Sequence, residues 1–386
     1  MNAPHFPRSI SARPDAQRRS AFARICAWRE WDSPAATMRW QALAETASTP
    51  NPFFEPWYLL SALHAFDPDG EARLLVVESG DTLIGLMPLA SVRRYGRWPL
   101  PHLAPWLHAN AFLGAPLVRA GYETAFWAAA LALLDRTARS ALFLHLPAMP
   151  LDHRLTTALN ELAAMQGRTA ALVMREERAL LHSALSPDAY LEAALTGKKR
   201  KELRRQHARL AELGDLTFER RDDAYGITTW IEDFLVLERA GWKGRAGSAM
   251  ACAPETAALF RNALMQAARL GKLERLTLAL DGRPIAMLAN FLTPPGSFSF
   301  KTAFDESWAR FSPGVLLQRE NLALLLRDGI AWCDSCAAPD HPMIDSLWTE
   351  RRAIGRISVG LGGSVRQALF NQMVARELGR NPTGIV

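Results

Sequence analysis

The sequence predicts an α/β protein built from two units of related plan. Strand and helix patterns alternate along both halves of the chain. Each half contains a pair of strands joined by a reverse turn, followed by an irregular segment, a helix and a further strand. The chain has 386 residues, which fits two domains, and 49% of its residues are hydrophobic, which is enough for a large core. The shared plan suggests internal duplication, although no residue-level repeat is visible.

The first predicted unit covers residues 21–185, after a polar N-terminus at 1–20 that we expect to be disordered. Pro56 opens a helix, because proline is well tolerated in the first helical turn. Ser, Gly and Asp at 79–81 have turn chemistry and predict a hairpin. The expected elements are a helix at 56–66, strands at 73–78 and 82–89, a helix at 123–140, a strand at 141–146 and a helix at 155–166.

The second predicted unit covers residues 186–386 and opens with a helix at 187–213. Asp328 and Gly329 form a stop signal for a later, very apolar helix. The other expected elements are strands at 273–280, 284–292 and 297–305, a turn at 312–314, a helix at 315–327 and a strand at 330–336.

The helix that opens the second unit is strongly basic. Residues 198–209 contain seven Lys or Arg and one Glu, a pattern that nucleic-acid-binding segments share. No aromatic residues are interleaved to stack on bases. The alternative interpretation is a solvated helix face, or one that borders an anionic ligand. The net charge of +6 suits an anionic ligand without requiring a nucleic acid.

A candidate anion site lies at the start of the apolar helix, at the turn Ser312-Pro313-Gly314. A helix start leaves backbone N–H groups free, and the helix dipole favours anions there. Arg310 precedes the turn and could add a charge-assisted contact to a phosphate. A rival glycine-rich loop at 360–364 does not follow a clear strand. The candidate cofactor-binding residues are therefore Arg310, Ser312, Gly314, Val315 and Leu316.

Polar residues also gather where the last predicted strand ends. Asp334, Asp340 and His341 lie at the carboxyl end of this strand and in the loop after it, where α/β sheets tend to place ligands. A carboxylate or imidazole there could accept a proton from an attacking amine. The alternative is that the aspartates form turns and the histidine lies on the surface.

Two other places offer candidate site residues. The predicted strand at 297–305 alternates, so that Lys301 and Asp305 share the face opposite its phenylalanines. They form either an exposed ion pair or part of a cleft lining. Trp242 and Lys243 lie in a loop after a helix, where the tryptophan is either a core anchor or a wall of a binding site.

Cysteine content and hydropathy exclude several classes of protein. Four cysteines in so long a chain argue against a disulfide scaffold and for a reducing compartment. Cys333 and Cys336 form a CxxC without a second pair, so we expect no metal, and within a strand they would point to opposite faces. No apolar run approaches the roughly 20 residues of a membrane span. The first 20 residues lack the apolar region of a secretory signal, so we expect a cytoplasmic protein.

At these motifs the chain resembles a known family, the FemAB-like branch of the GNAT acyltransferases, in particular the predicted acetyltransferases grouped with CelD of cellulose biosynthesis. The N-terminal half is similar to the family only at residues 83–89. The matching segments of the C-terminal half are Gly197-Lys198-Lys199-Arg200, Gly241-Trp242-Lys243-Gly244, the segment 300–306, the segment 312–317, Asp334-Ser335-Cys336-Ala337 and Asp340-His341-Pro342-Met343.

The resemblance implies tandem GNAT-like units, each a mixed sheet flanked by helices, of which the second is complete. It implies acyl transfer from acetyl-CoA or another acyl-CoA, with the pyrophosphate at residues 310–317. The usual GNAT loop has two small residues, whereas this chain has the single Gly314 preceded by Pro313, which lacks an N–H. Members of the FemAB family proper use aminoacyl-tRNA, so tRNA is an alternative donor.

We therefore predict an acyltransferase in which an amine or hydroxyl of a small molecule or saccharide attacks the donor directly. Its pathway would be polysaccharide or cell-envelope biosynthesis. Asp334 or His341 is the predicted base, and Lys301, with Asp305 on the same face, orients a reactant. Trp242, Lys243 and Asp340 would contact the acceptor. The alternative from another class is a non-catalytic protein that binds nucleic acid or polysaccharide machinery.

Overall fold

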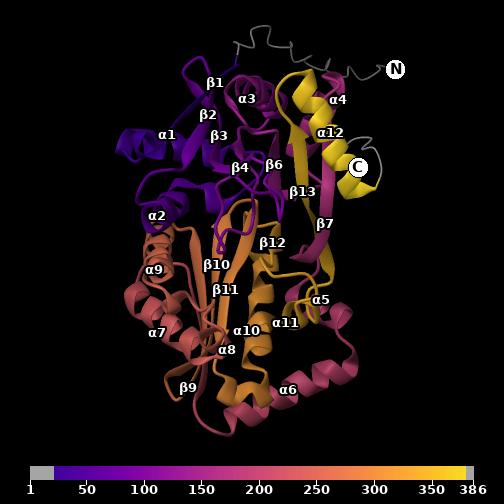
Figure 1. Ribbon diagram of the computed structural model, residues 1–386. Helices are drawn as coiled ribbons and strands as arrows, with labels where there is room; N and C mark the ends of the chain where they lie inside the picture. The colour runs from indigo at the N-terminus through magenta and orange to yellow at the C-terminus, as the bar shows by residue number, and fades with distance from the viewer. Residues whose placement is uncertain (1–20, 380–386) are drawn as a thin grey trace, which may run out of the picture.

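The computed structural model describes residues 21–379, so the disorder expected for residues 1–20 lies outside the described part of the chain. All strands of this part belong to one mixed 13-stranded sheet, with helices packed along it (Figure 1). The strand order is β1-β2-β3-β4-β6-β13-β7-β12-β11-β10-β9-β8, and β5 pairs with β3. A mixed sheet flanked by helices confirms the predicted α/β fold class.

Both halves of the chain use the same order of strands and helices. The elements of the first half are β1 (Ala21–Ala27), α1 (Pro34–Glu45), α2 (Pro56–Phe66), β2 (Arg73–Ser79), β3 (Thr82–Val92), β4 (His102–Pro105), β5 (Leu117–Val118), α3 (Glu123–Thr137), β6 (Phe143–Pro150), α4 (Arg154–Met165) and β7 (Ala170–Leu181).

The second half starts with two helices that have no counterpart in the first half, α5 (Pro187–Ala194) and α6 (Gly197–Ala211). The remaining elements are β8 (Leu216–Arg221), α7 (Ile227–Ala240), α8 (Trp242–Arg245), α9 (Pro254–Arg269), β9 (Leu273–Leu280), β10 (Arg283–Thr293), β11 (Gly296–Phe304), α10 (Pro313–Asn321), β12 (Trp332–Asp334), α11 (Pro342–Asp345), β13 (Glu350–Gly360) and α12 (Ser364–Leu378).

The two halves exchange their last strands at the centre of the sheet. β13, from the second half, lies between β6 and β7, and β7, from the first half, lies between β13 and β12. The two exchanged strands pair with each other along most of their length, from Glu350 opposite Leu180 to Val359 opposite Ala170. The order of strands therefore reads alike from either end of the sheet. This exchange joins the two predicted units into one sheet.

Each half contains one parallel pair of neighbouring strands. β4 pairs with β6 at Leu103 and Leu144, and β11 pairs with β12 from Gly296 to Phe298. β11 continues to Phe304, whereas β12 turns to pair with β7 and ends at Asp334. The second half of β11 consequently has no partner on that side, and the two parallel strands part there.

A β-bulge in β11 corrects the predicted faces of that strand. Ala289 of β10 is opposite Lys301 and Asn290 is opposite Ser299, so Phe300 is the extra residue. Phe300 packs in the core cluster next to α9, whereas Phe304 packs against the cluster around α10. The regular alternation predicted for 297–305 was therefore wrong, because the bulge shifts the faces after Phe300.

Two predicted helices differ in their extent from the structure. The basic segment forms two helices, because Leu195 is extended and the Thr196 hydroxyl accepts a hydrogen bond from the Lys199 N–H, which caps α6. The apolar helix predicted at 315–327 is α-helical only to Asn321 and continues as a 3₁₀ segment to Leu326. The predicted strand at 330–336 is shorter and covers Trp332–Asp334.

The core continues across the junction of the two halves. α2 packs against α9, and Phe53 of the first half touches Phe298 of the second, with ring centroids 5.8 Å apart. A buried ion pair also crosses the junction, with Lys272 Nζ 2.6 Å from Glu55 Oε2. The gap that opens between β11 and β12 therefore lies next to the loops of the first half.

A candidate active site between the two halves

Lys301 lies on β11 just beyond the point where β11 and β12 part. Its ammonium is 5.6 Å from the ring centroid of Phe112 and 5.7 Å from that of Phe300. Burial and, to a smaller extent, the nearby Lys243 ammonium lower the pKa of Lys301 to about 8, against the opposite effect of Glu238. The charged and neutral forms of this amine are thus both accessible near neutral pH.

His108 comes from the loop between β4 and β5 and lies close to Lys301. Its ring stacks on Tyr58, with centroids 6.0 Å apart and planes 12° from parallel. Burial and the Lys301 charge lower the pKa of His108 to about 4, so the imidazole is neutral at pH 7. Its Nε2 is buried without a hydrogen-bond partner among residues 21–379. The sequence analysis missed His108, which no motif marks.

Asp334 is fully buried at the end of β12 and forms ion pairs with two arginines. Its Oδ2 is 2.7 Å from Arg178 of β7 and 2.7 Å from Arg352 of β13, the two exchanged strands. Its Oδ1 accepts the Cys336 N–H. Burial would raise the pKa of Asp334, but the two guanidinium groups outweigh it and hold the pKa below the usual range. A carboxylate held this way is a poor proton acceptor, which argues against the predicted role of Asp334 as base.

His341 and Asp340 lie in the loop that leads to α11. Asp340 is exposed and has a φ of 59°, as expected for a residue that forms a turn. His341 is the N-cap residue of α11 and is half-buried. Its Nδ1 is buried and finds no hydrogen-bond partner within the described part of the chain. Of the predicted bases, His341 therefore keeps a free ring nitrogen.

The start of α10 offers fewer free donors than predicted. Pro313 has no N–H, and the N–H groups of Val315 and Leu316 both donate to the Ser312 carbonyl. The Gly314 N–H remains for an anion. A Cβ at Gly314 would lie 2.8 Å from Met343 Sδ, so α11 packs directly against this turn.

The other predicted site residues have structural contacts. The Asp305 carboxylate accepts the Ser307 N–H and hydroxyl, so it caps a 3₁₀ turn and does not pair with Lys301. The Lys243 ammonium donates to Glu238 and to the Thr302 carbonyl, which ties the end of α7 to β11.

Trp242 and Arg310 are exposed, and each makes a local contact. Trp242 is 52% exposed, while its backbone N–H donates to the Glu306 carboxylate. The Arg310 guanidinium lies 4.6 Å from the ring centroid of Phe311, near the start of α10. Both side chains are accessible to a ligand.

The CxxC cysteines are buried and unpaired, and they lie on opposite faces of the sheet. Cys333 packs with the cluster around α10, and Cys336 packs with the cluster that contains Phe300. Among residues 21–379, no group of three or more His, Cys, Asp or Glu side chains is arranged to hold a metal ion. No helix within these residues is long and apolar enough to cross a membrane.

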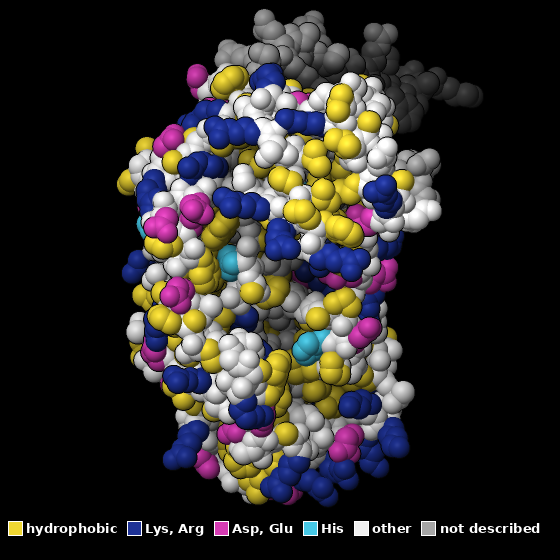
Figure 2. All heavy atoms as spheres, in the orientation of Figure 1, with side chains coloured by type: hydrophobic (Ala, Val, Ile, Leu, Met, Phe, Trp, Pro, Cys, Tyr) yellow, Lys and Arg dark blue, Asp and Glu magenta, His cyan; other side chains and the backbone are white. Residues whose placement is uncertain are grey.

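Figure 2 shows a hollow in the middle of the molecule, where the two halves meet, with histidine side chains on its rim. Lysine and arginine side chains also gather at the lower end of this view, where α6 runs. The structure brings together Lys301, His108, Asp334 and the two arginines, whereas the turn at α10 lies at the other end of the free part of β11.

Comparison with known proteins bears on what this arrangement does. Residues 197–341 match the model of a family described as "Acetyltransferase (GNAT) domain". A search among curated proteins found no relative by sequence. The fold is similar to that of FemX, with a TM-score of 0.55 at 12% identity over 88% of this chain and 98% of FemX.

Two other solved structures share the fold. The first is the C-terminal domain of a putative lysylphosphatidylglycerol synthetase from Agrobacterium fabrum, with a TM-score of 0.52 at 15% identity over 88% of this chain and 95% of that one. The second is a conserved protein of unknown function from Bacteroides thetaiotaomicron, with a TM-score of 0.52 at 12% identity over 85% of this chain and 97% of that one. These findings confirm the predicted resemblance to FemAB-like GNAT proteins, with the acetyltransferase-domain match limited to residues 197–341.

Proposed function

We propose that the chain transfers an acyl group from acetyl-CoA or another acyl-CoA to an amine or hydroxyl of a small molecule or saccharide. The observation that carries this proposal is the parting of β11 and β12 beside Lys301, within the residues that match the acetyltransferase family. An extended thioester can hydrogen-bond to the free edge of β11 in that gap. A role in polysaccharide or cell-envelope biosynthesis remains part of the proposal.

The reaction would be a direct attack on the thioester. The acceptor nitrogen or oxygen forms a bond to the acyl carbon, the carbon–sulfur bond breaks, and the CoA thiolate leaves and takes up a proton. His341 is the proposed base, because its Nδ1 has no hydrogen-bond partner among the described residues. The Lys301 ammonium and backbone N–H groups would stabilise the oxyanion. Asp334 would act as a positioning residue that holds Arg178 and Arg352.

The proposed donor site is the turn at Ser312, Gly314, Val315 and Leu316, with Arg310 beside it. The free Gly314 N–H and the exposed Arg310 support this assignment. Met343 lies against Gly314 and would have to move aside, which its flexible thioether side chain permits. The exposed Trp242 and Asp340, with Lys243, remain candidate acceptor contacts.

Aminoacyl-tRNA is a second candidate donor, favoured by the exposed basic face of α6. Binding of tRNA by this face would fall steeply with salt and would not depend on base sequence. Such binding by the basic face alone would therefore not distinguish tRNA from other polyanions. If filter binding instead shows tight and sequence-selective association with tRNA at physiological salt, the protein has a specific tRNA site beyond this face, and the acyl-CoA assignment loses to this alternative.

Calorimetry with acetyl-CoA tests the donor site. We expect the protein to bind acetyl-CoA and Gly314→Asp to weaken binding at least about tenfold, because a second negative charge and a side chain enter the phosphate position. Gly363→Asp is the matched control, since a Cβ there meets nothing within 4 Å and it lies in the rival glycine-rich loop. Absence of binding at millimolar acetyl-CoA, or loss of binding only in Gly363→Asp, would contradict the assignment.

Release of free CoA thiol tests the base, because thioester hydrolysis needs no knowledge of the acceptor. His341→Ala should lower turnover by about 10²–10⁴-fold, whereas the exposed His64→Ala should not change it. If His108→Ala abolishes turnover and His341→Ala does not, the base is His108.

The pH dependence of the same reaction tests Lys301. If its charge stabilises the oxyanion, turnover should fall as pH rises through about 8, where the ammonium loses its proton. Lys301→Arg should move this fall to higher pH because a guanidinium stays charged, and Lys301→Met should lower turnover at every pH. An unchanged profile in Lys301→Arg would remove Lys301 from the mechanism.

A further inference from the structure

A second cavity lies away from the candidate site, between α7 and the end of the sheet formed by the edge strand β8 and its neighbour β9. Its volume is about 610 Å³, within the range of small-ligand sites. None of the candidate active-site residues lines it. Its walls carry hydroxyl, carboxylate, guanidinium and aromatic groups, among them Thr217, Asp233, Arg221, Tyr225 and Trp230.

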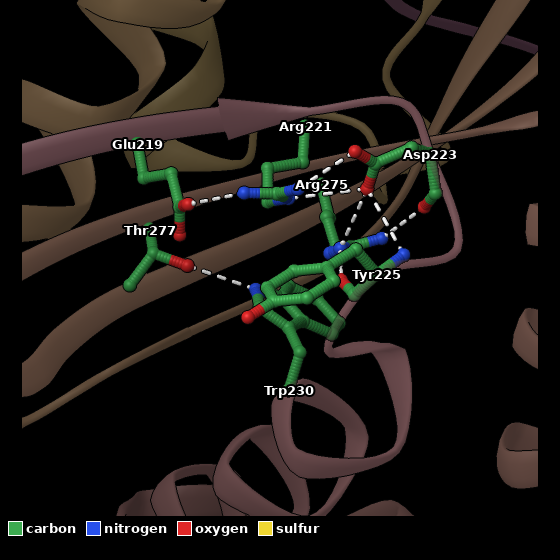
Figure 3. Close-up of polar contacts among 7 residues, drawn as sticks. All are labelled: Glu219, Arg221, Asp223, Tyr225, Trp230, Arg275 and Thr277. Atoms are coloured by element: carbon green, nitrogen blue, oxygen red, sulfur yellow. Dashed lines mark hydrogen bonds and ion pairs between the residues drawn. The ribbon is translucent and has the colours of Figure 1, made fainter.

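The positive charges of this cavity are already neutralised by the protein. Arg221 donates to Asp223 at 2.7 Å and to Glu219 at 3.0 Å (Figure 3). Arg275, which is buried, donates to the Asp223 carboxylate and to the carbonyls of Asp223 and Tyr225. An anionic ligand would therefore have to compete with two carboxylates for these guanidinium groups.

The same network holds an exposed aromatic ring in place. The Tyr225 N–H donates to Asp223 Oδ1, and its carbonyl accepts from Arg275, so both backbone groups are fixed. The ring itself is 77% exposed at the edge of the cavity, and the Arg221 guanidinium lies 4.9 Å from its centroid. An aromatic side chain whose backbone is held in this way presents its ring at the edge of the cavity, where it can stack on a ligand.

Trp230 supplies a second aromatic surface from α7. Its Nε1 donates to the Thr277 hydroxyl at 2.8 Å, which fixes the indole against β9 (Figure 3). The Asp233 carboxylate, one helical turn further along α7, is exposed and has no hydrogen-bond partner within residues 21–379. The hydroxyl groups of Thr217 and Thr229 also line the cavity.

We propose that this cavity binds a neutral, hydroxyl-rich ligand, namely a saccharide. Free carboxylate and hydroxyl groups can bond to sugar hydroxyls, while the aromatic rings can cover the apolar face of a sugar ring. The neutralised arginines disfavour a phosphate or a nucleotide. This proposal does not depend on acyl transfer, because no residue of the cavity belongs to the proposed catalytic machinery.

Isothermal titration calorimetry with cellotriose and triacetylchitotriose, each at millimolar concentration, tests the proposal, and inorganic tripolyphosphate serves as the anionic comparison. We expect a binding isotherm for at least one trisaccharide and none for tripolyphosphate. Tyr225→Ala and Asp233→Asn should each weaken binding roughly tenfold, as truncation of an aromatic or charged contact commonly does. Both side chains are exposed, so the fold should survive these changes.

Two control variants separate this site from the candidate active site. Phe218→Ala removes a 40% exposed aromatic ring from β8 without touching the cavity lining, and it should leave binding unchanged. Lys301→Met should also leave it unchanged. The proposal is wrong if neither trisaccharide binds, if only tripolyphosphate binds, or if binding survives Tyr225→Ala and Asp233→Asn but is lost in Lys301→Met.

Discussion

Beside its parallel strands β4 and β6, the first half of the chain packs His102, Phe143 and His145 against one another, under α12. The rings of His102 and Phe143 stack 4.9 Å apart, and His145 Nδ1 is 2.9 Å from the Ser358 hydroxyl. Beside β11 and β12, by contrast, Lys301 of the second half lies close to His108 from a loop of the first half, whose Nε2 is unpartnered among the described residues. The same order of elements thus encloses a filled space in one half and reactive groups in the other.

The helices that connect the parallel strands differ in the same way. α3 begins with Glu123, a buried carboxylate in the first turn, which occupies the end of the helix that attracts anions. α10 has no acidic residue in its first turn and begins with Pro313 and Gly314. An anionic donor would be repelled at α3 and accepted at α10. The comparison therefore supports the proposal that the chemistry takes place in the second half, and that the first half contributes structure and the loop that carries His108.

Removal of the buried charge of Asp334 should have the largest effect on stability. Asp334→Asn leaves Arg178 and Arg352 buried beside each other without a counter-charge, and we expect a loss of about 3–5 kcal/mol in the free energy of unfolding. Urea denaturation measures it. Arg175→Met on the same strand is the control, because its exposed ion pair with Glu177 should contribute less than about 1 kcal/mol. A stable Asp334→Asn variant with low turnover would restore Asp334 as the base.

The histidines of the first half should make that half sensitive to acid. Burial, with His102 and Arg356 nearby, lowers the pKa of His145 to about 4, and burial lowers the pKa of His102 as well. Between about pH 6.5 and 4 the unfolded chain binds protons that the folded chain does not, so stability falls as pH falls through this window. In the folded protein, His145 becomes fully charged only at pH values below its pKa of about 4.

Urea denaturation at pH 7 and pH 5 measures this dependence. His145→Gln, which keeps a hydrogen-bonding partner for Ser358, should reduce the loss of stability on acidification by about 1–2 kcal/mol. The exposed His64→Gln should leave it unchanged. If wild type and His145→Gln lose the same unfolding free energy between pH 7 and pH 5, the buried histidine of the first half does not cause the acid sensitivity. The contrast drawn between the packing of the two halves would then fail.

Two glycine substitutions give the smallest and most direct comparison of the halves. A Cβ at Gly85 would lie 2.1 Å from the ring of Phe126, which is fully buried, so Gly85→Ala should cost about 1–3 kcal/mol. At Gly314 the nearest atom is Met343 Sδ, which can move, and Gly314→Ala should cost less than about 1 kcal/mol. Thermal denaturation of both variants checks the pair. If both variants lose the same stability, the start of α10 is packed as tightly as the surroundings of Gly85 in the first half.

Much of the local structure could be predicted from the sequence. The strand Leu273–Leu280 and the helix Pro56–Phe66 occur at the predicted residues, because short-range hydrophobic periodicity and turn residues specify them. The related plan of the two halves was also visible in the order of these elements. The motifs in the second half, from Gly197 to Met343, carried the resemblance that the family match at 197–341 supports.

The arrangement of the candidate site depends on contacts between residues far apart in the chain. The exchange of β7 and β13 brings Arg178 and Arg352 to Asp334, 156 and 18 residues away in sequence, and no local pattern encodes such pairing. The two guanidinium groups brought together in this way hold the pKa of Asp334 below its usual range, against the opposite effect of burial, and this argues against Asp334 as the base.

The sequence by itself determined the α/β class, the two related halves and about half of the helices and strands, because these follow from periodicity within a few residues. Only the tertiary structure decided which polar groups share a site. The bulge at Phe300 turns Lys301 toward the first half, and a loop without any motif brings His108 beside it. Protonation and reactivity depend on burial and on neighbouring charges in space, and these exist only once the strands of both halves have joined in one sheet.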